Sequence, residues 1–73
     1  MTDKLPILSG KEVVKALGKL GYMVNDQKGS HIHIRHPFRR PLTVPNHPEV
    51  ARGTLRFIIK DADLTIEKFL ELL

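Results

Sequence analysis

Three histidines and an arginine lie within the ten-residue stretch "KGSHIHIRHP", residues 28–37. Histidine is the side chain best suited to exchange protons near neutral pH, so it serves as a general acid or a general base. Side chains alternate along a strand, so His31, His33 and Arg35 share one face and the isoleucines between them share the other. We expect the isoleucines to enter the core. The stretch therefore predicts a histidine-bearing strand face in contact with solvent.

The residues before His31 predict a tight corner. Gly29 adopts a positive φ at no steric cost, which would fix the direction of the next side chains. Lys28 supplies a positive charge for a phosphate group. Ser30 either orients the imidazole, offers its backbone N–H to a phosphate, or simply fills the turn. These alternatives stay open at the level of sequence.

A metal site built on the pair His31 and His33 is the weakest interpretation of the same stretch. Two imidazoles are too few for a closed zinc site, and the chain contains no cysteine. His36, which could complete a set of three, falls on the opposite strand face by parity. We therefore predict neither a metal ion nor a cofactor.

An amphipathic helix precedes the histidine stretch. Ser9 and Glu12 have the spacing of a capping box, and Leu8 and Val13 that of a hydrophobic staple. Gly21 suits the C′ position at the other end. The helix has an apolar stripe, formed by Val13, Ala16, Leu17 and Leu20.

Residues 22–44 predict a three-stranded antiparallel meander. The expected strands are 22–27, 31–36 and 42–44, with a loop at 37–40 and Pro45 closing the last strand. Antiparallel sheets can leave one face in water. We expect the histidine face to be that open face.

Two short helices follow, the first opened by Gly53 and Thr54 and the second capped by Thr65. Their apolar stripes are Leu55, Ile58, Ile59 and Ala62, then Ile66, Phe69, Leu70 and Leu73. The predicted class is α+β, in the order α-β-β-β-α plus a short C-terminal helix, with the helices on one sheet face. Residues 1–73 are expected to form a single domain.

Charge and composition limit the kinds of partner. Lys and Arg number 12 against 8 Asp and Glu, which favours an anionic partner, nucleic acid first. The start lacks a basic leader followed by an apolar stretch, and no run is apolar enough to cross a bilayer. We expect a cytoplasmic protein without a membrane partner.

The sequence resembles the HicA toxins, small mRNA interferases of bacterial and archaeal toxin–antitoxin systems. The resemblance covers nearly the whole chain, through "LSGKEVVKALGKLGY", "KGSHIHIRHP", "LTVPNH" and "GTLRFIIKDADLTIEKFLEL". It implies a fold like that of double-stranded-RNA-binding domains, ribosome-independent cleavage of mRNA, and a HicB-like antitoxin that covers the active site in a hetero-oligomer. The family's catalytic histidine, the one after Gly-Ser, corresponds to His31. The chain departs from the family in the loop Phe38-Arg39-Arg40, where a small turn residue is common.

RNA-binding residues are expected around His31 and on other basic positions; they are Lys28, Gly29, Ser30, His33, Arg35, Arg39, Arg40 and Arg56. The resemblance carries no catalytic role onto His33. The residue that performs the second proton transfer is not identified by the sequence. An alternative function is a non-catalytic RNA-binding module with the same fold, which would bind A-form RNA by shape.

Overall fold

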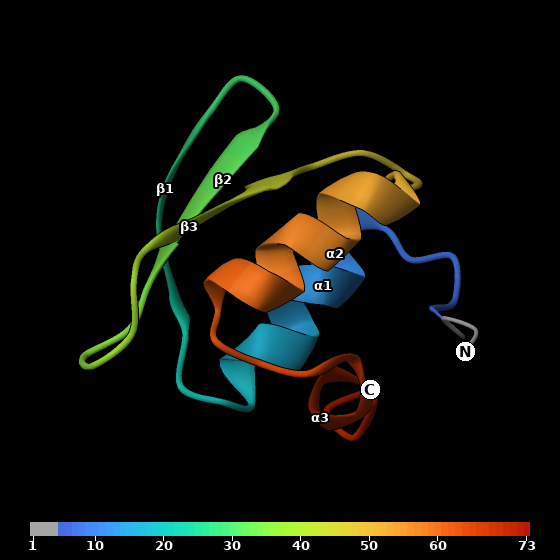
Figure 1. Ribbon diagram of the computed structural model, residues 1–73. Coiled ribbons are helices and arrows are strands. Elements are labelled where there is room, and N and C mark those ends of the chain that lie inside the picture. The colour runs from blue at the N-terminus through green and yellow to red at the C-terminus, as the bar shows by residue number, and fades with distance from the viewer. Residues whose placement is uncertain (1–4) are drawn as a thin grey trace.

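The computed structural model describes residues 5–73, and its element order agrees with the α-β-β-β-α-α prediction. The three strands form one antiparallel sheet in the order β1-β2-β3, so β2 is central. Helices α1 and α2 lie together on one side of the sheet, and the other side is open (Figure 1). The elements are α1 (Gly10–Gly18), β1 (Met23–Lys28), β2 (His31–Arg35), β3 (Leu42–Pro45), α2 (Arg52–Asp61) and α3 (Ile66–Leu70).

The ends of α1 follow the predicted capping chemistry. The Glu12 N–H donates to Ser9 Oγ over 3.1 Å, and the Ser9 N–H donates to Glu12 Oε1 over 2.8 Å. At the other end the Gly21 N–H donates to the Gly18 carbonyl, and the Tyr22 N–H to that of Leu17. These two bonds form a Schellman motif with Gly21 at C′, where its φ is +117°.

The two C-terminal helices are short. α2 begins at Arg52, one residue before the predicted start, and its N-cap Ala51 offers no side-chain hydrogen bond. α3 is capped as predicted, because Thr65 Oγ1 accepts the Lys68 N–H over 3.1 Å. Among residues 5–73, no helix has the length and apolar character needed to span a membrane.

The core lies between the sheet and the helices. Ile32 and Ile34 of β2 are buried there, while His31 and Arg35 are exposed on the other face, as strand parity predicts. Helix residues of the predicted stripes fill the opposite side, including Val13, Ala16, Leu17, Leu55, Ile58, Ile59, Ala62 and Phe69. Leu73 was predicted in the last stripe, and this is wrong. α3 ends at Leu70, so Leu73 lies beyond the helix and remains 49% exposed.

The edge strand β1 differs in detail from the prediction. Tyr22 was expected to begin it, but that residue is buried and the strand begins at Met23. The register between β1 and β2 shifts between Val24 and Asp26, which is a β-bulge. All six residues of β1 are exposed, and the tip of the β1–β2 hairpin extends past the helices (Figure 1).

Candidate functional site

The site begins at the corner between β1 and β2. Lys28 and His31 pair directly across the two strands, so the loop consists of Gly29 and Ser30 alone. Gly29 has a φ of +58°, whereas Ser30 has no positive φ, which is the pattern of a type II′ hairpin turn. The predicted tight corner is confirmed. It places the first residue of β2 at a fixed position next to a lysine.

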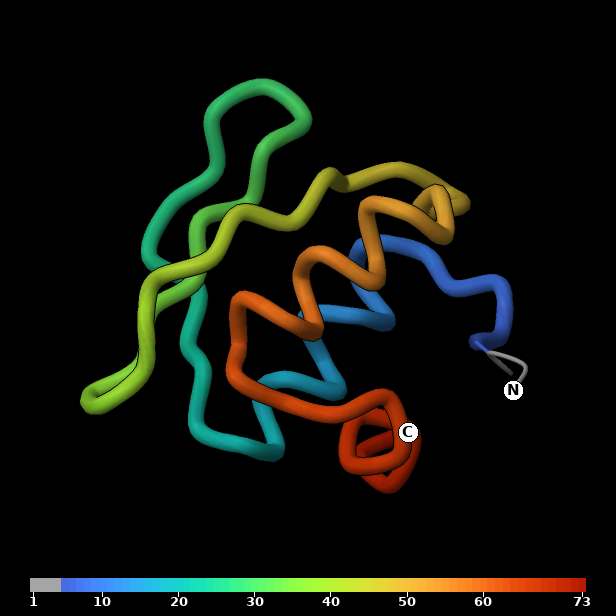
Figure 2. Tube along the Cα trace, in the orientation of Figure 1, coloured from blue at the N-terminus to red at the C-terminus, as the bar shows by residue number. Residues whose placement is uncertain are grey.

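The segment after β3 supports this corner. The Asn46 N–H donates to the Ser30 carbonyl over 2.6 Å, and the Gly10 N–H donates to the His47 carbonyl over 2.9 Å. A Cβ added to Gly10 would collide with the Pro45 carbonyl oxygen and lie 2.9 Å from the Asn46 Cα. Figure 2 shows the segment before α1 running beside the one that follows β3. The start of α1 and the corner are thus joined through residues 45–47.

His31 lies at the start of the central strand, between Lys28 on β1 and Pro45 on β3. Its side chain is exposed. Within residues 5–73 its imidazole forms no hydrogen bond or ion pair, which leaves both ring nitrogens available to a ligand. The same described part of the chain holds no group of three or more His, Cys, Asp or Glu placed to bind a metal ion.

His33 follows on the same face and has a carboxylate partner. Its Nδ1 lies 2.6 Å from Asp26 Oδ1, and the two side chains are 37% and 47% exposed. Asp26 was not among the residues predicted from the sequence to form the site. A two-residue corner between Lys28 and His31 places residue 26 opposite residue 33, so hairpin geometry would have found the pair.

Arg35 is the third residue of this row and is exposed. Its Nη1 lies 3.5 Å from Asn25 Oδ1, at the limit of a hydrogen bond. Together with His31, His33 and Lys28 it forms the surface that we call the histidine face.

Arg39 and Arg40 lie at the other end of β2, in the loop that projects beside the sheet (Figure 1). Arg39 Nη1 donates to the Ala62 carbonyl over 2.7 Å, and Arg40 Nη1 lies 3.3 Å from Asp61 Oδ1. A strand advances about 3.3 Å per residue, so the backbone of Arg35 already lies about 13 Å from that of His31. Arg39 and Arg40 follow beyond the end of this strand. The structure therefore brings both loop arginines to the end of α2, away from His31.

His36 and Tyr22 hold this loop in place. The His36 Nε2–H donates to the Leu20 carbonyl over 3.0 Å, while its Nδ1 accepts the N–H groups of Phe38 and Arg39. The Tyr22 hydroxyl donates to the Arg40 carbonyl over 2.9 Å. Burial raises the pKa of Tyr22 above 10.0, and the positive charge of Arg39 partly opposes this rise. The phenyl ring of Phe38 remains 92% exposed.

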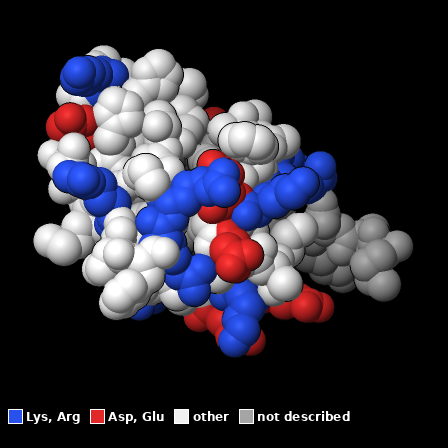
Figure 3. Space-filling view, turned by 60° about the vertical axis from the view of Figure 1, so that its left-hand side comes forward, with Lys and Arg blue, Asp and Glu red and all other residues white. Residues whose placement is uncertain are grey.

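Arg56 belongs to α2, in the helix layer, so it does not share the face that carries His31. In the view of Figure 3 the Lys and Arg side chains are distributed over the surface, with acidic side chains between several of them. On the side shown in Figure 3 the basic side chains are therefore spread out, and the histidine face holds only part of the protein's Lys and Arg.

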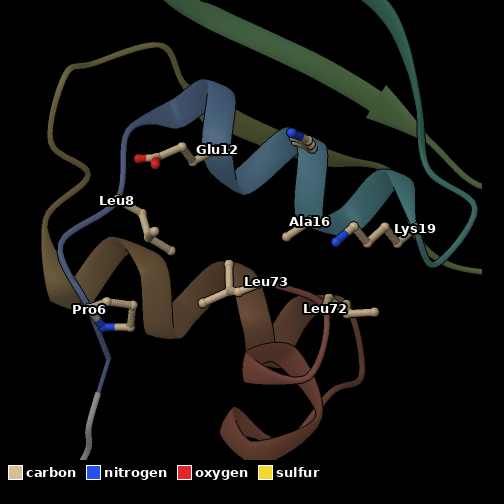
Figure 4. Close-up of a pocket in the computed structure, with 8 residues that line it drawn as sticks. Pro6, Leu8, Glu12, Ala16, Lys19, Leu72 and Leu73 are labelled. Carbon is tan, nitrogen blue, oxygen red and sulfur yellow. The ribbon is translucent and has the colours of Figure 1, made fainter.

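A separate pocket lies between α1 and the C-terminal end of the chain (Figure 4). Leu8, Ala16 and Leu72 contribute apolar surface to it, and Lys15 and Lys19 lie at its side. Among the lining residues that the structure describes, the one acidic side chain is Glu12, which already caps α1. The described part of the lining contains no histidine and so offers no proton-transfer group comparable to the histidine face.

The chain is similar to a known protein family and to a solved structure. A family model described as the HicA toxin of bacterial toxin–antitoxin systems matches residues 10–64. A chain in the solved structure of a toxin–antitoxin complex from Streptococcus pneumoniae is 38% identical, with a TM-score of 0.70 over 78% of this chain and 98% of that one. No curated protein sequence matches. The family match covers the capped helix, the whole sheet and α2. The chain therefore belongs to the HicA family of toxins.

Proposed function

We propose that this protein is the toxin of a type II toxin–antitoxin system and acts in the cytoplasm as a metal-independent endoribonuclease. It cleaves mRNA without the ribosome, and His31 is its catalytic residue. The observation that carries the proposal is the state of His31. Its imidazole is exposed beside Lys28 and forms no hydrogen bond within residues 5–73, at a hairpin corner that the Asn46 N–H holds through the Ser30 carbonyl.

The chemistry needs a proton acceptor and a proton donor. The 2′-hydroxyl of RNA attacks the adjacent phosphorus once a base removes its proton, and an acid protonates the 5′-oxygen as the P–O5′ bond breaks. The products are a 2′,3′-cyclic phosphate and a free 5′-hydroxyl. A positioned histidine contributes about 10²–10⁴-fold to such a step. Lys28, opposite His31, stabilises the negative charge that develops on the phosphate oxygens.

RNA contacts are proposed in two groups. The first surrounds His31 and consists of Lys28, Gly29, Ser30, His33 and Arg35. The second consists of Arg39, Arg40 and Arg56, which lie away from the histidine face and would contact a different part of a long RNA. Phosphate contacts fix the position of the RNA and carry no sequence information.

A HicB-like antitoxin is the proposed protein partner, in a hetero-oligomer that covers His31. The similar chain comes from a toxin–antitoxin complex, which supports a partner of this kind. Phe38 is a suitable contact for such a partner, because burying an exposed aromatic ring contributes favourably to the free energy of binding.

The test is cleavage of a long RNA by the purified protein, without ribosomes and in the presence of EDTA. We expect cleavage, and we expect the cognate antitoxin to stop it. Cleavage that appears only when ribosomes or divalent metal ions are added would contradict the proposal.

A further inference from the structure

The contact between His33 and Asp26 gives His33 a role that the sequence does not assign to it. We propose that His33 is the second catalytic residue of the cleavage reaction, donating a proton to the leaving 5′-oxygen, and that Asp26 is its positioning residue. This inference rests on the proposed endoribonuclease function and specifies the proton donor left open there.

The short distance between His33 Nδ1 and Asp26 Oδ1, 2.6 Å, determines which nitrogen can reach a substrate. The carboxylate accepts a hydrogen bond from Nδ1–H, so Nε2 is the ring nitrogen left to contact a ligand on the open face. A carboxylate behind an imidazole fixes its tautomer and orientation and stabilises the positive charge of the protonated ring. His33 can therefore present an Nε2–H to a leaving oxygen.

The spacing of His31 and His33 fits an in-line displacement at phosphorus. They are two residues apart on the same face of β2, which separates their backbones by about 6–7 Å. The attacking and leaving oxygens of an in-line displacement lie on opposite sides of the phosphorus. His31 then takes the 2′-hydroxyl proton while His33 releases its Nε2 proton to O5′, so one proton is gained and one is lost. Exchange with water restores both rings.

The charge of Asp26 argues against a surface made only for binding. A carboxylate in the middle of a phosphate-binding face repels the phosphates and weakens affinity. An exposed ion pair of this kind adds only about 0–1 kcal/mol to the free energy of unfolding. Neither RNA affinity nor stability therefore accounts for the placement of Asp26, whereas proton transfer by His33 does.

The test compares His33→Ala with His31→Ala on two short RNAs cut by the parent at one mapped site, with metal chelated. One RNA has the ordinary 5′-oxygen as leaving atom, and the other has sulfur there, a leaving group that needs no proton. We expect His33→Ala to cut the oxygen RNA about 10²–10⁴-fold more slowly than the parent. On the sulfur RNA its rate should return close to that of the parent, whereas His31→Ala should be slow on both. Equal slowing of His33→Ala on both RNAs, or no slowing on either, would overturn the assignment.

Asp26→Asn provides the second measurement. It should bind RNA more tightly than the parent, because a negative charge is removed, and yet cleave the oxygen RNA more slowly. Adding it to His33→Ala should cause no further loss of rate, since both act through one group. Asp26→Asn with unchanged cleavage would refute the positioning role. If the parent cuts no RNA at all, so that no site can be mapped, the endoribonuclease function fails; if the parent cuts and His33→Ala cuts equally well, only this inference fails.

Discussion

The guanidinium of Arg39 donates a hydrogen bond to the backbone carbonyl of Ala62 over 2.7 Å. Ala62 is the C-cap of α2, where carbonyl groups lack partners within the helix and a positive charge is favourable. Arg39 is half-buried there. This arginine therefore joins the β2–β3 loop to the end of α2.

Arg39→Ala should lower the free energy of unfolding by about 1–2 kcal/mol, because a charge-assisted bond to a helix end is lost. Urea unfolding measures this. Arg35→Ala is the matched control, since Arg35 is exposed and has only a marginal contact with Asn25; its unfolding midpoint should stay close to that of the parent. Equal unfolding midpoints for the two variants would contradict this assignment.

RNA affinity should depend on salt through the histidine face. Each phosphate contact on single-stranded RNA contributes about −0.7 to the slope of log K against log salt. Lys28→Ala and Arg35→Ala should each reduce the slope by about that amount, measured by titrating a labelled RNA at several salt concentrations. Lys68→Ala, on α3, is the control and should leave the slope unchanged. If none of the three substitutions changes the slope, RNA does not bind at the histidine face.

Gly10→Ala should destabilise the protein by about 1–3 kcal/mol, because the new methyl group would meet the backbone of Pro45 and Asn46. Gly18→Ala is the matched control. It places the same methyl group in α1 where no atom beyond its neighbours and its own helix backbone lies within 4 Å, so it should stabilise the helix by up to about 1 kcal/mol. Thermal melting of both variants checks this prediction. A Gly10→Ala protein as stable as the parent would show that the α1 start does not hold residues 45–47.

Alkaline pH should destabilise the fold through Tyr22, the chain's one tyrosine. Burial raises its pKa in the folded state, so the folded protein holds this proton more tightly than the unfolded chain. The stability contributed by Tyr22 is complete below pH 10.0 and is lost as the pH rises through the folded-state pKa. Ultraviolet absorbance of the tyrosinate measures that pKa.

Tyr22→Phe is the control for this pH dependence. It should cost about 1 kcal/mol at neutral pH, because the bond to the Arg40 carbonyl is lost, and the difference from the parent should shrink as the pH rises above 10.0. A difference that is constant with pH would contradict the role of Tyr22.

Local signals in the sequence predicted most of the fold. Ser9, Glu12 and Thr65 form capping hydrogen bonds with residues three positions away. Strand parity separates the isoleucines from the histidines without any long-range information. The bulge near Asn25 could not be predicted, because residues 23–28 contain no glycine or proline that would mark it.

The candidate site was less accessible from sequence. From the sequence, Arg39 and Arg40 were predicted only as basic residues that bind RNA. Their contacts with Ala62 and Asp61, more than twenty positions away, show that they also attach the loop to the end of α2. Asp26 was missed for a different reason. Its link to His33 follows from the two-residue corner, but an isolated aspartate in a polar strand has no distinguishing pattern.

The antitoxin should stabilise the toxin by mass action. A partner that binds only the folded protein adds about 2.7 kcal/mol when its free concentration is a hundred times Kd. We expect the melting temperature of the toxin to rise with antitoxin concentration while RNA cleavage falls. An antitoxin that raises the melting temperature but leaves cleavage intact would show that it binds away from His31.

His31→Ala tests the central claim most directly, through the rate of cleavage of a long RNA with metal chelated. The His31 imidazole is exposed and forms no hydrogen bond with the described residues, so the variant should melt like the parent and bind RNA with nearly the same affinity. Its cleavage rate should fall by about 10²–10⁴-fold, while Lys68→Ala cleaves like the parent. A folded His31→Ala protein that cuts RNA as fast as the parent would contradict the claim, because His31 would then have no catalytic role.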